Sequence, residues 1–433
     1  MKLPSETNQS DGPNLTPVID VVFLLLIFFL VATRFDQEER ELDVELPEVV
    51  QAQPIAMTQG LVINVTQDGT VKVVGNVYSH QQLAVLIREA RRNNPHQTAL
   101  IRGDGIGKEI VDATLRVIDA LDAPIEWEEA FAGSGALLNY GSPLPDATLD
   151  SMARTRVALK GPCETPIGAG FRSVNVAIRK HFDLYANVRP ARNVPGLKTR
   201  FDDVDMVLVR ENTEGAYAGI EHRIPPNWSA AESIILVTRQ GCERVLKYAF
   251  EYARRAGRKR VTLVHKANIL KETSGLFLEV GRQLAPQYSD IEFNDTIVDA
   301  TCMKMVIDPS QFDVVVTTNL FGDILSDLAA GLIGGLGLTP GANIGENCAM
   351  FEAVHGTAPD IAGKGIANPT AVMLAGAMML EHLDMVDRAT LMRQAIDATL
   401  ATADTRTGDL GGKLSTEQYT DAVLRNLDAL RAK

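Results

Sequence analysis

Hydrophobic residues follow two different patterns in this chain. Residues 15–35 form a nearly unbroken apolar run, enough for a single helix to cross a hydrocarbon core of about 30 Å. Beyond about residue 98, short apolar stretches alternate with amphipathic ones. Alternation of this kind predicts strands and helices stacked in a layered α/β fold. The chain therefore reads as a membrane segment followed by a globular region.

The globular region can be assigned in part element by element. We expect strands at 204–210, 260–265 and 313–318, where short apolar runs lie between polar segments. Between them, helical periodicity predicts helices at about 242–255, 274–284 and 323–332, with three more near the C-terminus. With 433 residues, of which 45% are hydrophobic, the chain is long enough for two or three domains and a sizeable core.

Composition narrows the classes of function. The formal net charge of −13 and the lack of a long basic run argue against a nucleic-acid partner. The four cysteines include no C-x-x-C pair, which suits a reducing compartment and argues against a disulfide framework or a thiolate zinc site.

The apolar run 15–35 has three interpretations. A cleavable signal would need a basic start and a small-residue cleavage site, and a buried soluble helix would need a polar face. Residues 23–29 are all large and apolar, so a transmembrane helix after a short tail, 1–14, is favoured. Asp20 lies within it, either as a proton-carrying group or as an acid that reaches the interface.

Three arginines suggest an anion site. Arg179, Arg189 and Arg210 lie beside expected helix or strand ends. A guanidinium binds a carboxylate with two parallel hydrogen bonds, so three of them in one cleft would suit a polycarboxylate. Taken singly, each would more often form a surface ion pair; as a set they favour a substrate site.

Aspartates suggest a divalent cation. Asp323 and Asp327 are one helical turn apart, and oxygen ligands at that spacing suit Mg²⁺ or Mn²⁺. The alternative is an acidic first helical turn stabilised by the helix dipole. Asp299 is a candidate third ligand.

Two side chains are candidates for moving protons. Lys266 follows an expected strand, where burial could lower its pKa enough for a base, and Tyr217 lies in an expected loop from which a phenol could donate. Either could instead be structural. The string Gly103-Asp-Gly-Ile-Gly107 is a weak nucleotide-binding signal, and a tight turn is an equally good interpretation.

Together these strings, from about residue 99 to about residue 430, resemble the isocitrate/isopropylmalate dehydrogenase family, most closely its NAD-dependent isocitrate dehydrogenases. The resemblance implies that family's two-domain α/β fold over 98–433. Ser173 and Asn175 favour isocitrate, because the isopropylmalate branch has apolar residues there. A 3-isopropylmalate or homoisocitrate-type dehydrogenase is the alternative within the family.

The resemblance also implies roles for individual residues. Isocitrate would be bound by Ser173, Asn175, Arg179, Arg189 and Arg210. Mg²⁺ or Mn²⁺ would be held by Asp299, Asp323 and Asp327. Lys266 would act as the base and Tyr217 as the acid. Lys266 and Asp299 would come from a neighbouring subunit, so the minimum assembly would be a homodimer with a shared active site in the cytoplasm.

The implied cofactor is NAD. The family's cofactor residues map onto Thr165, His355, Gly356, Thr357, Ala358, Asp360, Ile361 and Asn368. A carboxylate at Asp360 can accept hydrogen bonds from an adenosine ribose but would repel a 2′-phosphate, so we expect NAD rather than NADP.

The N-terminal quarter resembles a different family, the ExbD/TolR proton-motive-force transducers. The resemblance rests on 14–29 and 42–47, then a strand at 61–66, a turn at Asp68-Gly69, a strand at 70–74 and a helix-like stretch at 79–94. It implies a proton pathway through Asp20 and a truncated periplasmic-type α+β domain at 36–97. The rival function is therefore a transport subunit, and inner-membrane anchoring through 15–35 is the corresponding location.

Overall fold

The computed structural model describes residues 63–65, 71–73, 76–79, 82, 96–164, 173–225 and 229–432. The expected transmembrane helix at 15–35, Asp20 within it and Thr165 lie outside these residues. Across the described parts of the chain, no helix combines the length and apolar character needed to cross a membrane.

A small antiparallel sheet precedes the main fold. It contains β1 (Ile63–Val65), β2 (Val71–Val73) and β3 (Asn76–Tyr78) in that order. Ile63 pairs with Val73 and Val65 with Val71, so the two expected strands are confirmed and lie antiparallel, while the expected turn at Asp68-Gly69 lies outside the described residues. The third strand was not predicted. Of the expected helix at 79–94, only Ser79 and Gln82 are described; Gln82 is helical and Ser79 is not.

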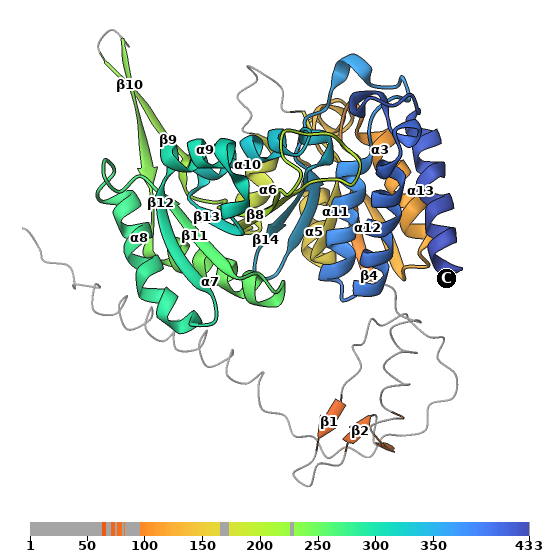
Figure 1. Cartoon of the computed structure of the whole chain (residues 1–433), viewed down its shortest axis with the longest axis horizontal. Coiled ribbons are helices and arrows are strands. Elements are labelled where there is room, and N and C mark those ends of the chain that lie inside the picture. Colours follow the sequence, from red (N-terminus) through yellow and green to blue (C-terminus); the bar gives the residue numbers. More distant parts are fainter. Residues whose placement is uncertain are drawn as a thin grey trace, which may run out of the picture. The chain divides into compact units, whose positions relative to one another are not determined.

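One ten-stranded mixed sheet organises the rest of the described chain (Figure 1). Its two outer blocks are parallel, and β7 and β14 join them through antiparallel pairs. In spatial order the strands are β12 (Glu292–Ile297), β11 (Arg260–His265), β13 (Val314–Thr317), β8 (Asp205–Glu211), β7 (Ala186–Arg192), β14 (Pro340–Ile344), β15 (Ala349–Ala353), β6 (Val157–Lys160), β4 (His96–Ile101) and β5 (Ile125–Ala130). A separate hairpin pairs β9 (Gly215–Ile224) with β10 (Ala230–Leu236).

Helices cover both faces of the large sheet. They are α3 (Gly107–Ala120), α4 (Ser134–Tyr140), α5 (Asp146–Thr155), α6 (Val174–His181), α7 (Arg239–Arg255), α8 (Thr273–Leu284), α9 (Val298–Ile307), α10 (Asn319–Leu332), α11 (Thr370–His382), α12 (Val386–Ala401) and α13 (Thr416–Arg431). The three expected strands and three expected internal helices are confirmed, although α7 and α10 begin three and four residues earlier than expected. The three C-terminal helices are confirmed as well.

Alternation along the strands decides which helices each face meets. Val314 and Val316 pack in a core with α7 and α8, whereas Val315 packs with α10. In the other block, Met350 packs with α5 and α6, while Phe351 packs with α3 and α11. Successive side chains of a strand point to opposite faces, so each strand contributes to two cores.

Helix α7 illustrates how local sequence produces packing. The Thr238 side chain accepts a hydrogen bond from Gly241 N and caps the helix. Apolar residues three or four positions apart then form its buried face. At the centre, Phe250 is fully buried and stacks on Tyr288 with ring centroids 4.6 Å apart.

Replacing Phe250 tests this packing. We expect Phe250→Ala to lower the free energy of unfolding by about 3–5 kcal/mol, because it leaves a cavity under α7. Phe250→Leu removes much less volume and should cost well under half as much. Denaturant unfolding followed by circular dichroism measures both, and equal losses for the two variants would contradict the cavity explanation.

Candidate active site

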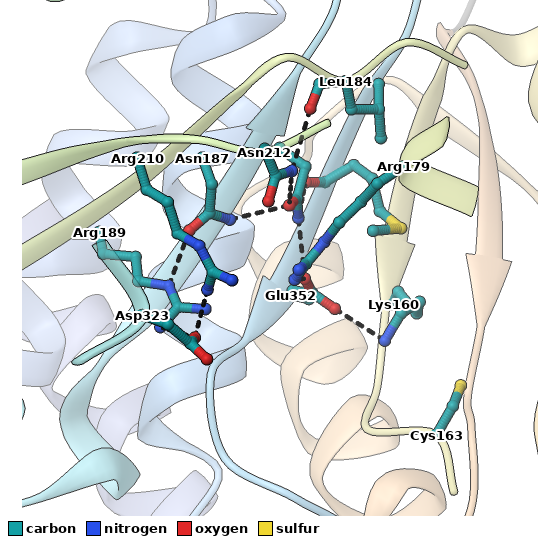
Figure 2. A network of polar contacts seen from close by, with 12 residues as sticks. Lys160, Cys163, Arg179, Leu184, Asn187, Arg189, Arg210, Asn212, Asp323 and Glu352 are labelled. Atoms are coloured by element: carbon teal, nitrogen blue, oxygen red, sulfur yellow. Dashed lines mark hydrogen bonds and ion pairs between the residues drawn. The ribbon is translucent and has the colours of Figure 1, made fainter. Parts of the chain in front are cut away.

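Three buried arginines gather over the centre of the large sheet (Figure 2). Arg179 lies in the last turn of α6, Arg189 on β7 and Arg210 on β8. Their exposed fractions are 9%, 6% and 1%. Arg189 was expected near the end of a helix or strand, but it lies in the middle of β7. It reaches the site because β7 lies at the centre of the sheet.

Asp323 is the main counter-charge to two of these arginines. It forms an ion pair with Arg210, and its other oxygen accepts a 2.6 Å hydrogen bond from the Tyr217 hydroxyl. Arg189 Nη1 lies 3.8 Å from Asp323 Oδ1 and 3.5 Å from Asp327 Oδ1. The two aspartates therefore lie on one face of α10, as their spacing predicted, and both are turned towards one guanidinium.

The structure corrects two interpretations near Asp323. Helix α10 begins at Asn319 and has no acidic residue in its first turn, so stabilisation by the helix dipole does not explain Asp323 and Asp327. Tyr217 lies on strand β9 rather than in a loop. Tyrosine suits a strand, and pairing with β10 extends the backbone there.

Burial and neighbouring charges shift the pKa values of this cluster. Burial, followed by the positive charges of Arg210 and Arg179, lowers the pKa of Arg189 to about 10, so the group still carries its proton at pH 7. Burial alone would raise the pKa of Asp323, but Arg210, Tyr217 and Arg189 outweigh it and lower that pKa. Burial and the bond to Asp323 raise the pKa of Tyr217, which keeps its phenol protonated.

A second buried ion cluster adjoins the first and was missed by sequence reasoning. Glu352 on β15 accepts from Lys160 Nζ at 2.8 Å and from Arg179 Nη2 at 2.9 Å. Lys160 is 1% exposed and Glu352 is 4% exposed. Burial favours the neutral carboxyl, but the two cations prevail and lower the pKa of Glu352. A lone acid inside the apolar run Ala349–Ala353 was the signal that could have revealed it.

Lys266 and Asp299 form a separate pair on the surface of this chain. Lys266 follows β11 as expected, and its ammonium bonds to Asp299 in the first turn of α9. The Asp299 side chain is 68% exposed. No group of three or more histidine, cysteine or acidic side chains comes together as a metal site within the described residues. A single copy therefore brings Asp323 and Asp327 together without Asp299.

The expected cofactor residues follow β15. Pro359–Ile361 form a short 3-10 helix, and Ala358 before it has a left-handed backbone with φ of 39°. Such a conformation is unfavourable for alanine, and strain of this kind is concentrated at functional sites. Asn368 accepts from Thr370 N and donates to Asp409, at the start of α11.

The Gly103–Gly107 segment is a tight turn that supports this loop. Asp104 accepts hydrogen bonds from the backbone N–H groups of Ser134, Gly135 and Glu164, so both of its carboxylate oxygens hold backbone in place. Gly105 has φ of +56°, and a Cβ there would lie 2.1 Å from Thr357 O. The close approach of the two loops therefore requires glycine.

Some buried polar atoms have no partner among the described residues. There are ten such atoms in the described parts of the chain, and three of them belong to residues expected to bind substrate or cofactor: Asn175 Oδ1, Arg179 Nε and His355 Nε2. Ser173 precedes α6 but makes no capping bond with its side chain. Because buried polar groups are normally hydrogen-bonded, these orphaned atoms indicate places for ligand atoms.

Replacing Glu352 tests the buried ion cluster. Glu352→Gln would leave Lys160 and Arg179 without their counter-charge, and we expect a loss of about 3–5 kcal/mol in the free energy of unfolding at pH 7. The folded-state pKa of Glu352 is lowered, so its contribution is complete above the ordinary value of 4.5 and declines as pH falls below it. Denaturant unfolding at pH 7 and pH 4 should show a smaller gap at pH 4; a gap that widens on acidification would refute the assignment.

Comparisons with known proteins agree with this geometry. Residues 97–423 match the family described as isocitrate/isopropylmalate dehydrogenase, and residues 7–123 match the family described as biopolymer transport protein ExbD/TolR. The chain is 50% identical over 338 residues to the mitochondrial NAD isocitrate dehydrogenase subunit 2 of Schizosaccharomyces pombe, covering 77% of this chain and 88% of that protein. It is 49% identical to the human mitochondrial NAD isocitrate dehydrogenase subunit alpha, covering 76% and 90%.

A solved structure extends the likeness to three dimensions. The crystal structure of isocitrate dehydrogenase from Methylococcus capsulatus matches with a TM-score of 0.75 and 58% identity, covering 77% of this chain and 99% of that one. The shared region carries the ten-stranded sheet and the arginine cluster. This chain belongs to the isocitrate/isopropylmalate dehydrogenase family.

Proposed function

We propose that this protein oxidises and decarboxylates isocitrate to 2-oxoglutarate with reduction of NAD. The observation that carries the proposal is the set of three buried arginines, two of them beside Asp323 and the third paired with Glu352, in a chain of this family. Buried guanidinium groups are costly unless they are paired, and here the cations outnumber the nearby buried carboxylates. A tricarboxylate would supply the missing negative charge.

The residues present fit both a nicotinamide cofactor and a divalent ion. His355, with its unpaired Nε2, and Gly356–Ile361 with Asn368 would hold NAD, together with Thr165. Asp323 and Asp327 would hold Mg²⁺ or Mn²⁺, for which carboxylate oxygens are the preferred ligands. When bound, NAD accepts the hydride and the ion stabilises negative charge on substrate oxygens.

Each remaining residue has a defined task. Arg179, Arg189 and Arg210 bind and orient substrate carboxylates, and Ser173 with Asn175, whose Oδ1 is unpaired, contacts the rest of the substrate. Lys266 takes the proton from the substrate hydroxyl. Tyr217, kept protonated by burial and by Asp323, returns a proton to carbon after CO₂ leaves.

The active site is proposed to need two copies of the chain. Lys266 and Asp299 lie together on the surface, whereas Asp323 and Asp327 lie with the arginines. Large apolar residues near them are exposed: Met303 (55%), Ile307 (66%), Leu320 (39%) and Ile324 (53%) on α9 and α10. Burying this surface in a dimer would bring Lys266 and Asp299 to the partner's aspartates and complete a three-carboxylate site.

The rival function is an ExbD/TolR-like transport subunit, favoured by the match at 7–123. Residues 97–123 belong to both matches. In the structure β4 pairs with β5 and β6, and Ile110, Val111 and Val117 of α3 are fully buried. Because these residues are used in the dehydrogenase sheet and core, they support the enzymatic function rather than the transport function.

The enzymatic proposal is tested with the full-length protein. We expect NAD reduction that depends on isocitrate and on Mg²⁺ or Mn²⁺ and that EDTA abolishes, with little activity on 3-isopropylmalate or with NADP. Lys266→Ala should reduce kcat by at least about 100-fold, because it removes the base. Normal turnover by Lys266→Ala, or wild-type turnover after complete metal removal, would overturn the mechanism.

The shared site is tested by complementation. Lys266→Ala and Asp327→Asn proteins should each be inactive as homodimers. After mixed refolding or co-expression, half of the dimers would carry one intact site, so activity should recover to about a quarter of wild type. Activity that stays at the level of the single variants would mean that each chain completes its own site.

A further inference from the structure

A continuous chain of buried hydrogen bonds joins Arg189 to Arg179 across the sheet (Figure 2). Arg189 Nε donates to Asn187 Oδ1 at 2.7 Å, and Asn187 Nδ2 donates to Asn343 Oδ1 at 2.8 Å. Asn343 Nδ2 then donates to Glu352 Oε1 at 2.8 Å. The same oxygen accepts from Arg179 Nη2 at 2.9 Å. The connection crosses three neighbouring strands, β7, β14 and β15.

The Asn343 amide, at the middle of this chain, is saturated with hydrogen bonds. Its Oδ1 also accepts from Asn212 Nδ2 at 3.0 Å, and its Nδ2 also donates to Met350 O at 3.3 Å. An asparagine side chain offers two donors and two lone pairs, and all four are used here. Asn343 is fully buried, so the amide cannot turn over without leaving several polar groups unpaired.

The neighbours on the two sides of Asn343 have opposite requirements. The ionised Glu352 needs a donor, whereas Asn187 presents one and needs an acceptor. A primary amide supplies both in fixed directions, while a carboxylate supplies only acceptors and an aliphatic side chain supplies neither. Position 343 therefore requires asparagine, because only a primary amide can bond to both Asn187, which holds Arg189, and Glu352, which holds Arg179.

We infer that Asn343 is a positioning residue that sets the spacing between Arg179 and Arg189 for two carboxylates of one substrate. The inference rests on the proposed function, since it requires these arginines to bind the substrate. Asn343 acts through Glu352 and Asn187, which bond to the arginines, and does not bond to an arginine itself. Because the carboxylates are held in the ground state and in the transition state alike, a misplaced arginine raises KM more than it lowers kcat.

Steady-state kinetics of Asn343→Leu in the full-length protein test the inference. We expect KM for isocitrate to rise by about tenfold or more, from the loss of hydrogen bonds that anchor charged groups, with kcat changed by less than about threefold. Asn212→Leu is the matched control. Asn212 is also a buried amide bonded to Asn343, but its other bond is to Leu184 O and none of its bonds is to an arginine. It should lose stability while KM stays within about twofold of wild type.

The Asn343→Asp variant supplies a signature that a merely structural role would not give. At low pH the introduced carboxyl is protonated, its O–H can donate to Glu352, and its C=O can accept from Asn187 and Asn212. As pH rises the proton is lost and two carboxylates face each other. KM relative to wild type should therefore fall towards one on acidification from pH 9 to pH 6, whereas the ratio for Asn343→Leu should not depend on pH.

Charged groups on the surrounding elements determine the pH at which the carboxyl introduced in Asn343→Asp loses its proton. All of these groups are also present in Asn343→Leu, which therefore serves as the control for their own titration. They are Glu352 on β15, Lys160 on β6, Arg179 on α6, Arg189 on β7, Arg210 on β8 and Asp323 on α10.

The outcomes separate this inference from the proposed function. A wild-type protein without isocitrate-dependent NAD reduction would refute the function. The inference would be refuted if the wild type is active and the Asn343 variants give less active protein but the same KM. An equal rise in KM for Asn212→Leu would refute it as well. Should Asn343→Leu not fold, Asn343→Asp and Asn187→Leu carry the same test, because Asn187 bonds directly to Arg189.

Discussion

Positive charge buried on one face of a sheet is the constraint on which the rest of this structure depends. Lys160, Arg179, Arg189 and Arg210 are all at least nine-tenths buried within a few strands of each other. Removing such groups from water costs several kcal/mol each unless carboxylates compensate. Glu352 and Asp323 compensate in part, but burial, together with the repulsion between the remaining positive charges, lowers the pKa of Arg189 and Arg210. A polyanionic substrate would reduce the same repulsion. The uncompensated positive charge therefore both destabilises the fold and favours a substrate with several carboxylates.

The central strands satisfy this constraint because they have two different faces. Asn187, Asn343 and Glu352 point towards the arginines and bond to one another. The alternate residues Val188, Ala342 and Phe351 lie on the opposite side and line a cavity with α7 and α11. Period-two alternation thus separates a dense polar network from an apolar layer by the thickness of one backbone. The buried amides of Asn187 and Asn343 lie on β7 and β14, the strands that join the two parallel blocks, and their hydrogen bonds tie the two halves of the site together.

The first strand of the large sheet also bears on what the N-terminal quarter can do. Residues 97–123 satisfy the patterns of two unrelated families at once, because a short apolar strand followed by an amphipathic helix is a common unit. Here β4 has partners on both edges and α3 contacts α11 and α13. Because both edges of β4 and the apolar face of α3 are covered, neither is available to a second fold.

Local patterns in the sequence were enough for three strands and six helices of the main fold, for the shared helix face of Asp323 and Asp327 and for the set of three arginines. Those features depend on periodicity, on i to i+4 spacing and on residue chemistry, all of which are written along the chain, whereas the family was inferred from the resemblance of longer strings to its members. The hydrogen-bonded connection of the arginines through Glu352 and Asn343 was not predicted, since these residues are far from Arg179 and Arg189 in sequence and are brought near them only by strand order. Tyr217 was placed in a loop because hairpin pairing is a long-range contact. Only the tertiary structure decided which charges face each other, because burial and distance set the electrostatic energy and neither is a property of the sequence alone.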